Sequence, residues 1–208
     1  VVDCGIVGEN TLIEGNANVA TIDRLGFGKC RLSIALPRGQ EYEAATQLSG
    51  KRIATSYPQM LRKFLNENNV DADIHTISGS AEIAPSIGLA DAICDLVSSG
   101  NTLFTNGLKE VETVLESEAV LISRNNVSSA VKSVLDSLRV RIRAVNAARE
   151  IEKLLPGIKS PTVMPLAESG WSSVHSVIGI DDHWKIVEGL KAAGAEGILV
   201  ISIDQMIR

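Results

Sequence analysis

The densest group of polar residues in the sequence lies between Asp91 and Leu103, near the middle of the chain. The apolar run 92–97 predicts a buried strand that carries Asp95, and a loop rich in serine, glycine and threonine follows it directly. In an open parallel sheet, ligands bind beyond the carboxyl ends of the strands, where such a loop and a helix N-terminus offer N–H groups and hydroxyls to an anion. We therefore expect a phosphate here, with Asp95 accepting hydrogen bonds from sugar hydroxyls. The alternative is a turn followed by a helix N-cap.

Two other strand ends carry polar residues of interest. Glu82 follows a Ser-Gly-Ser turn, where a carboxylate either binds a ligand or metal or is an ordinary acidic residue in the first turn of a helix. Thr55 and Tyr57 stand where the predicted strand 52–55 leads into a helix. Thr55 is a candidate phosphate contact and Tyr57 a candidate for stacking on a base, although a helix N-cap beside a half-exposed tyrosine explains the same residues.

Composition excludes several classes of function. The chain has 208 residues, of which 45% are hydrophobic and 22% charged, so it is globular rather than disordered. A net charge of -5 and 3% aromatic residues argue against nucleic acid as the main partner, because phosphate backbones require a basic face and bases require stacking partners. No apolar run is long enough to span a membrane. Three widely spaced cysteines favour a reducing compartment, so we expect a cytoplasmic protein.

Strands and helices alternate through the first two thirds of the sequence, which predicts a mostly parallel sheet covered by helices. Residues 8–18 are expected to form a loop. Expected strands are 2–7, 31–36, 52–55, 72–77, 92–97, 110–115 and 119–123, with helices from Pro58 and over 81–87. Ser128 is the expected N-cap of a long helix that ends near Leu155. A second, smaller domain follows, with strands 163–166, 173–178 and 197–203 and a helix over 182–193, an order that resembles part of a βαββαβ module.

These motifs resemble those of the ATP phosphoribosyltransferase family, which catalyses the first step of histidine biosynthesis. The family signature is a glutamate, a proline, a glycine, an acidic strand and a Ser/Thr-Gly-x-Thr loop. It stands here as Glu82-Ile-Ala-Pro85-Ser-Ile-Gly88-Leu-Ala-Asp91-Ala-Ile-Cys-Asp95-Leu-Val-Ser-Ser99-Gly100-Asn-Thr102-Leu103. Residues 3–10, 51–58 and 106–108 support the match, and residues 155–166 and 190–200 resemble the C-terminal regulatory domain of the long form.

The resemblance implies an α/β fold with three parts. A two-lobed, periplasmic-binding-protein-like catalytic region would occupy residues 1–127, a connecting helix 128–150, and a small ferredoxin-like (ACT-like) α+β regulatory domain 151–208. Family members begin with a further strand–helix segment whose arginines reach the nucleotide and pyrophosphate site, and they carry a strand ahead of the helix at Glu152. Neither segment is found here, so we expect both to be missing and the active site to be incomplete.

The implied reaction joins N1 of the adenine of ATP to C1 of phosphoribosyl pyrophosphate and expels pyrophosphate. It passes through an oxocarbenium-like state, so positioning and charge stabilisation dominate. Asp95 and Glu82 would be catalytic, and Asp91 and Asp95 would bind the substrate together with the loop residues Ser98, Ser99, Gly100, Asn101 and Thr102. Thr55 and Tyr57 would face the nucleotide. Mg²⁺ is the implied cofactor, with Glu82 or Asp91 as possible ligands.

The resemblance also implies partners and regulation. ATP and phosphoribosyl pyrophosphate would be the substrates, histidine a feedback inhibitor sensed by the second domain, and the protein a homo-oligomer between dimer and hexamer. A non-enzymatic small-molecule binding module of the solute-receptor type is the alternative, because the two-lobed fold also serves such receptors. The acidic strand that leads into a phosphate loop favours the enzyme.

Overall fold

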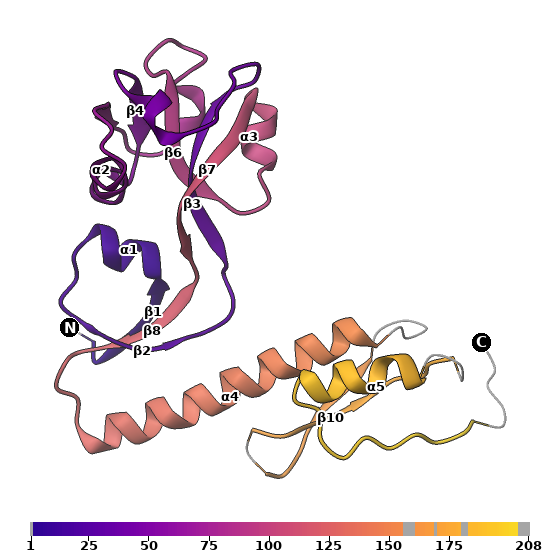
Figure 1. Ribbon diagram of the computed structural model, residues 1–208. Coiled ribbons are helices and arrows are strands. Elements are labelled where there is room, and N and C mark those ends of the chain that lie inside the picture. Colours follow the sequence, from indigo (N-terminus) through magenta and orange to yellow (C-terminus); the bar gives the residue numbers. More distant parts are fainter. Residues whose placement is uncertain (1, 156–160, 169, 180–182, 204–208) are drawn as a thin grey trace. The chain divides into compact units, whose positions relative to one another are not determined.

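The structure is a computed structural model that describes residues 2–155, 161–168, 170–179 and 183–203 (Figure 1). The chain divides into two compact units, Val1–Val127 and Ser128–Arg208. The first unit holds two sheets, and the residues predicted to do chemistry all belong to it.

The larger sheet has five strands in the order β5-β4-β6-β3-β7. Its strands are β3 (Cys30–Pro37), β4 (Arg52–Thr55), β5 (Asp73–Thr76), β6 (Ala92–Val97) and β7 (Leu108–Ser117). β4 pairs in parallel with β5 and β6, whereas β3 runs antiparallel to both β6 and β7. The predicted strands are therefore present, and four of the five run in the same direction, as expected for a mostly parallel sheet. The exception is β3, which is inserted between β6 and β7 in the opposite direction.

Helices and short turns cover the two faces of this sheet. α2 (Pro58–Glu67) starts with proline at its first position and buries Met60, Leu61 and Leu65 in the core cluster that contains Leu32 and Ile53. The opposite face is lined by small residues such as Ala35 and is covered by the 3₁₀ turn η2 (Ala81–Ile83) and by α3 (Asn101–Thr105). A second 3₁₀ turn, η1 (Ala45–Leu48), precedes β4. The predicted helix 81–87 is thus reduced to a single 3₁₀ turn.

The smaller sheet has three antiparallel strands in the order β1-β8-β2. They are β1 (Cys4–Gly8), β2 (Ala20–Arg24) and β8 (Ala119–Ser123). Sequence reasoning missed β2 and predicted a loop where α1 (Glu9–Glu14) lies. The glycines and asparagines that suggested a loop instead flank this helix, since α1 starts after Gly8 and ends at Gly15.

The second unit consists of two helices and a two-stranded sheet in its described part. α4 (Ser129–Leu154) is capped by Ser128, whose Oγ accepts a hydrogen bond from the N–H of Val131 at 3.3 Å. α4 continues through Glu150 and Ile151 without a break, four residues beyond the predicted connecting helix. β9 (Thr162–Pro165) pairs antiparallel with β10 (Ser172–His175), and α5 (His183–Ala192) follows.

One expected strand of the second unit is not formed. Residues 197–203 are described, but they belong to no strand, so the prediction of a strand there is wrong for this chain. Their apolar side chains are exposed, as at Leu199 and Ile201. Asp182, which was expected to begin the last helix, lies outside the described residues. Among the described residues, no helix is long and apolar enough to cross a membrane.

Candidate active site

Asp95 lies near the carboxyl end of β6, on the face of the sheet that carries small residues. β6 places Asp95 in register with Ser33 of β3, so both side chains lie on the same side of the sheet. Asp95 Oδ1 accepts a hydrogen bond from the N–H of Leu96 at 2.7 Å. Within the described part of the chain, no lysine or arginine forms an ion pair with this carboxylate. Its partial burial without a cation leaves it available to hydroxyl donors.

Glu82 of η2 lies close enough to influence Asp95 electrostatically. Burial raises the pKa of Asp95 above its ordinary value, and the negative charge of Glu82 raises it further, while the Leu96 N–H acts in the opposite direction. The two carboxylates that the sequence singled out as catalytic therefore lie within electrostatic range of each other. The charge of Glu82 disfavours the charged form of Asp95, and a cation or hydroxyl donors would offset that effect.

Thr55 and Tyr57 occupy the carboxyl end of β4, next to the end of β6. Thr55 is fully buried, and its Oγ1 accepts a hydrogen bond from the N–H of Tyr57 at 2.9 Å. Tyr57 is half-buried; burial raises the pKa of its hydroxyl, and the charge of Asp95 adds to that effect. Tyr57 packs against the core cluster that contains Ile53, within electrostatic range of Asp95, whereas Thr55 is occupied in shaping the turn.

The predicted phosphate loop is open to solvent. Ser98, Ser99, Asn101 and Thr102 are exposed, and Gly100 has a φ of 80°, in the left-handed region that favours glycine. The N–H of Asn101 donates to Ser99 Oγ at 3.4 Å. The loop is therefore a tight, glycine-dependent turn whose hydroxyls face outward, next to the strand end that carries Asp95.

Asp91, by contrast, lies at the other end of β6. Its carboxylate is engaged by Arg52, with Arg52 Nη2 at 2.8 Å from Oδ1, and the Arg52 N–H and Nε at 2.9 and 3.1 Å from Oδ2. These hydrogen bonds and the Arg52 charge lower the pKa of Asp91 to about 2. About 20 Å of extended strand separates this end from the loop. The structure does not bring Asp91 to the site that Asp95 occupies.

Two residues near the site escaped the sequence analysis because α1 was taken for a loop. Asn10 is buried: its N–H donates to Ser117 Oγ at 3.1 Å, and its Oδ1 accepts a hydrogen bond from the same hydroxyl at 3.0 Å. The carboxylate of Glu14 accepts hydrogen bonds from the N–H groups of Gln59 and Met60, at 2.9 and 3.1 Å. Glu14, the last residue of α1, therefore caps the N-terminus of α2. The four-residue spacing of Asn10 and Glu14, which places them one helical turn apart, is the sequence feature that could have indicated a helix here.

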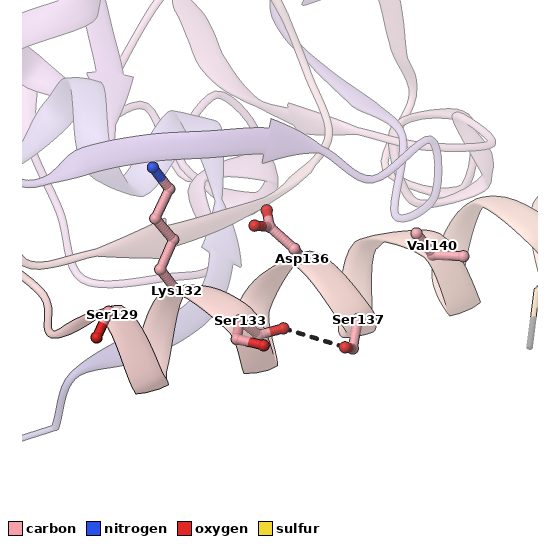
Figure 2. A pocket seen from close by; sticks show the side chains of 6 residues that line it. All are labelled: Ser129, Lys132, Ser133, Asp136, Ser137 and Val140. Carbon is pink, nitrogen blue, oxygen red and sulfur yellow. Dashed lines mark hydrogen bonds between the residues drawn. The ribbon is translucent and has the colours of Figure 1, made fainter.

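A separate hollow lies along α4 and contains none of the predicted residues. It is lined by Ser129, Lys132, Ser133, Asp136, Ser137 and Val140 (Figure 2). Ser137 Oγ donates to the carbonyl of Ser133 at 3.0 Å, so this hydroxyl is used within the helix. All six residues belong to one helix face, so the hollow is a shallow groove and does not gather groups from several elements.

Comparison with known proteins identifies the family. One family model, ATP phosphoribosyltransferase, matches residues 1–144, and a second, HisG C-terminal domain, matches residues 130–205. A curated ATP phosphoribosyltransferase from Cytophaga hutchinsonii is 52% identical, over 100% of this chain and 78% of its own length. A solved structure of the ATP phosphoribosyl transferase (HisG:HisZ) complex from Thermotoga maritima has a TM-score of 0.57 at 26% identity, covering 66% of this chain and 67% of its own.

The fold extends beyond that family. The substrate binding protein of an amino acid ABC transporter has a TM-score of 0.54 at 16% identity, covering 73% of this chain and 68% of its own. This likeness shows the fold alone, and it confirms the predicted two-lobed, periplasmic-binding-protein-like architecture. The family models and the identity to curated relatives go further than the fold. The chain belongs to the ATP phosphoribosyltransferase family.

Proposed function

We propose that this chain condenses ATP with phosphoribosyl pyrophosphate, forming N1-(5-phosphoribosyl)-ATP and pyrophosphate as the first step of histidine biosynthesis. The observation that carries the proposal is the pairing of Asp95 with the exposed 98–102 loop at one end of β6. A carboxylate and a hydroxyl-rich turn in that order suit a ribose 5-phosphate, which has hydroxyls at one end and an anion at the other.

In this assignment the 98–102 loop holds the 5′-phosphate. The exposed Ser99 and Thr102 hydroxyls and the N–H groups of the tight turn donate to phosphate oxygens. Gly100 permits the left-handed conformation that the turn requires. The loop thereby fixes the position of C1 relative to Asp95, and positioning of this kind supplies a large part of the rate enhancement in group transfer.

Asp95 and Glu82 act on the sugar. Asp95 accepts hydrogen bonds from the ribose hydroxyls, and the two carboxylates provide negative charge where positive charge develops on the ribose in the oxocarbenium-like transition state. Because Asp95 is partly buried, its charge is less screened by water than that of a surface carboxylate. Tyr57, beside Asp95, is assigned to the nucleotide.

Glu82 is also the carboxylate that we assign to a magnesium ion. Mg²⁺ binds proteins through one or two carboxylates plus substrate phosphates and keeps several waters, so it needs no all-protein cage. Of the two possible ligands, Glu82 or Asp91, Asp91 is engaged by Arg52, so Glu82 would hold the ion, and Mg²⁺ would offset charge on the leaving pyrophosphate.

The second unit is assigned to regulation. We propose that residues 151–208 sense histidine and inhibit the enzyme, with a coupling free energy of about 1–3 kcal/mol. A cytoplasmic homo-oligomer, from dimer to hexamer, completes the proposal. The match of residues 130–205 to the family's C-terminal domain supports assigning this unit a family role.

The test is a spectrophotometric assay of the full-length protein with ATP, phosphoribosyl pyrophosphate and Mg²⁺, with and without histidine. We expect an absorbance increase from phosphoribosyl-ATP that requires both substrates and that histidine suppresses. An increase that histidine does not affect would retain the enzyme and reject the sensor. A folded full-length protein that binds phosphoribosyl pyrophosphate without turnover would favour the solute-receptor alternative. The family match favours the enzyme.

A further inference from the structure

Arg31 of β3 contacts the start of the 98–102 loop. Its Nη1 donates to the carbonyl oxygen of Ser98 at 3.1 Å. β3 pairs with β6 so that Arg31 stands opposite Val97, the last residue of β6. Arg31 therefore reaches the loop at the point where it leaves the sheet.

Glu110 of β7 holds Arg31 in this position. Arg31 Nε lies 2.5 Å from Glu110 Oε1, and Arg31 Nη2 lies 2.5 Å from Oε2, so the ion pair is bidentate. Ser33 Oγ also donates to Glu110 Oε1, at 2.8 Å. Ser33 is fully buried and stands in register with Asp95, which places this cluster on the same face of the sheet as the carboxylate assigned to the ribose.

The geometry requires an arginine. A guanidinium has donors in a fixed planar fork, so two of its nitrogens can engage Glu110 while the third donates to a carbonyl. A lysine has a single nitrogen on a flexible stem and cannot do both with the same rigidity. The Arg31 side chain is 35% exposed and that of Glu110 24% exposed, so water screens this ion pair only in part.

We propose that Arg31 is a positioning residue for phosphoribosyl pyrophosphate, fixing the carbonyl of Ser98, and that Glu110 orients Arg31. This inference rests on the proposed function, because it assigns a support to the loop that is assigned to the 5′-phosphate. Arg31 acts through the loop and does not itself contact the substrate. Loss of the Arg31 side chain should loosen the loop and weaken the binding of phosphoribosyl pyrophosphate more than the binding of ATP.

The chain offers a closely matched control at the other end of β6. Arg52 also forms a bidentate ion pair, with Asp91, and its Nη1 also donates to a backbone carbonyl, that of Gly88 at 2.9 Å. The two arginines therefore make the same set of contacts, on the same sheet, at opposite strand ends. Only Arg31 contacts the loop, so the R31A and R52A variants separate loop positioning from a general loss of stability.

The experiment combines steady-state kinetics with hydrogen exchange on the whole chain. For R31A we expect the KM for phosphoribosyl pyrophosphate to rise about tenfold, the KM for ATP to change less than about twofold, and the amides of residues 99–102 to exchange faster. R31K and E110Q should shift the same quantities by smaller factors. R52A should lower the unfolding temperature without changing the ratio of the two KM values or the exchange of the loop.

Two results would overturn the inference: an R31A variant that raises both KM values equally, or one whose loop amides exchange at the wild-type rate. A wild-type chain without turnover would contradict the proposed function instead. In that case the exchange data still decide the role of Arg31, because faster exchange in R31A but not in R52A requires no activity. R31K supplies the answer if R31A fails to fold.

Discussion

Two aspartates lie at opposite ends of β6, in opposite environments. Asp91, at the start, is neutralised by a bidentate arginine, which lowers its pKa to about 2. Asp95, near the other end, lies partly buried beside Glu82, and its pKa is raised. A carboxylate satisfied by the protein stabilises the fold, whereas one left unpaired in a partly buried position is available to a ligand. Environment, more than residue type, separates the structural acid from the candidate catalytic one.

The largest effect expected from this contrast is on turnover in Asp95→Asn. The substitution removes the charge that faces the developing positive charge on the ribose, so kcat should fall about 10²- to 10³-fold. The free energy of unfolding should change by less than about 1 kcal/mol, because no ion pair is lost. Steady-state assays and urea titration measure the two quantities. Normal turnover in a correctly folded variant would reject the ribose assignment.

Thr102→Val tests the loop next to Asp95 and should give an intermediate effect. The valine keeps the shape of the side chain and removes the hydroxyl that donates to the phosphate. We expect the KM for phosphoribosyl pyrophosphate to rise about tenfold, the cost of one hydrogen bond to a charged group, with little change for ATP. Initial rates with each substrate varied in turn provide the measurement. An equal rise in the KM for both substrates would count against a phosphate-binding role for the loop.

Asp91→Asn should affect stability and leave catalysis unchanged. The variant weakens the ion pair with Arg52, but both side chains are more than a third exposed, so solvent screening limits the loss to about 1 kcal/mol. Urea-induced unfolding gives the free energy, and the same preparation gives kcat. A large fall in kcat at unchanged stability would return Asp91 to the active site and remove the contrast.

The smallest effect expected is a pH dependence of opposite sign at the two positions. The pKa of Asp91 falls from 3.8 to about 2 on folding, so its contribution is present above about pH 4 and is lost as the pH falls through 2. The raised pKa of Asp95 means that the native state loses stability as the pH rises above the ordinary value of 3.8. Unfolding free energies of wild type, D91N and D95N at several pH values should therefore diverge in opposite directions.

The sequence could predict elements whose signals are local. The apolar run at β6 and the stripe of α4 behind the Ser128 cap both mark their elements without reference to the rest of the chain. The pairing partners of each strand could not be predicted from the sequence, because no feature of residues 30–37 indicates that β3 lies antiparallel between β6 and β7. Residues 197–203 show the converse: their apolar pattern predicts a strand, but no strand forms there in the described structure.

The site was predicted in part for the same reason. Asp95 and the loop are adjacent in sequence, so their proximity could be inferred. The role of Asp91 depended on Arg52, 39 residues away, and that of Ser98 on Arg31, 67 residues away. The contribution of Asn10 depended on recognising α1, whose flanking glycines suggested a loop. Long-range partners decide which polar residues remain free, and a single sequence does not contain them.

The order of strands in the smaller sheet sets the order in which the first unit can assemble. All strands of the larger sheet come from the contiguous stretch 30–117, so that sheet can be completed as soon as this stretch leaves the ribosome. β1 and β2 are made earlier but pair only with β8, at separations as long as that of Cys4 from Ser123. Contacts this distant form slowly. The smaller sheet therefore closes last, and with it α1, which follows β1 and brings Asn10 to Ser117 of β7 and Glu14 to the start of α2.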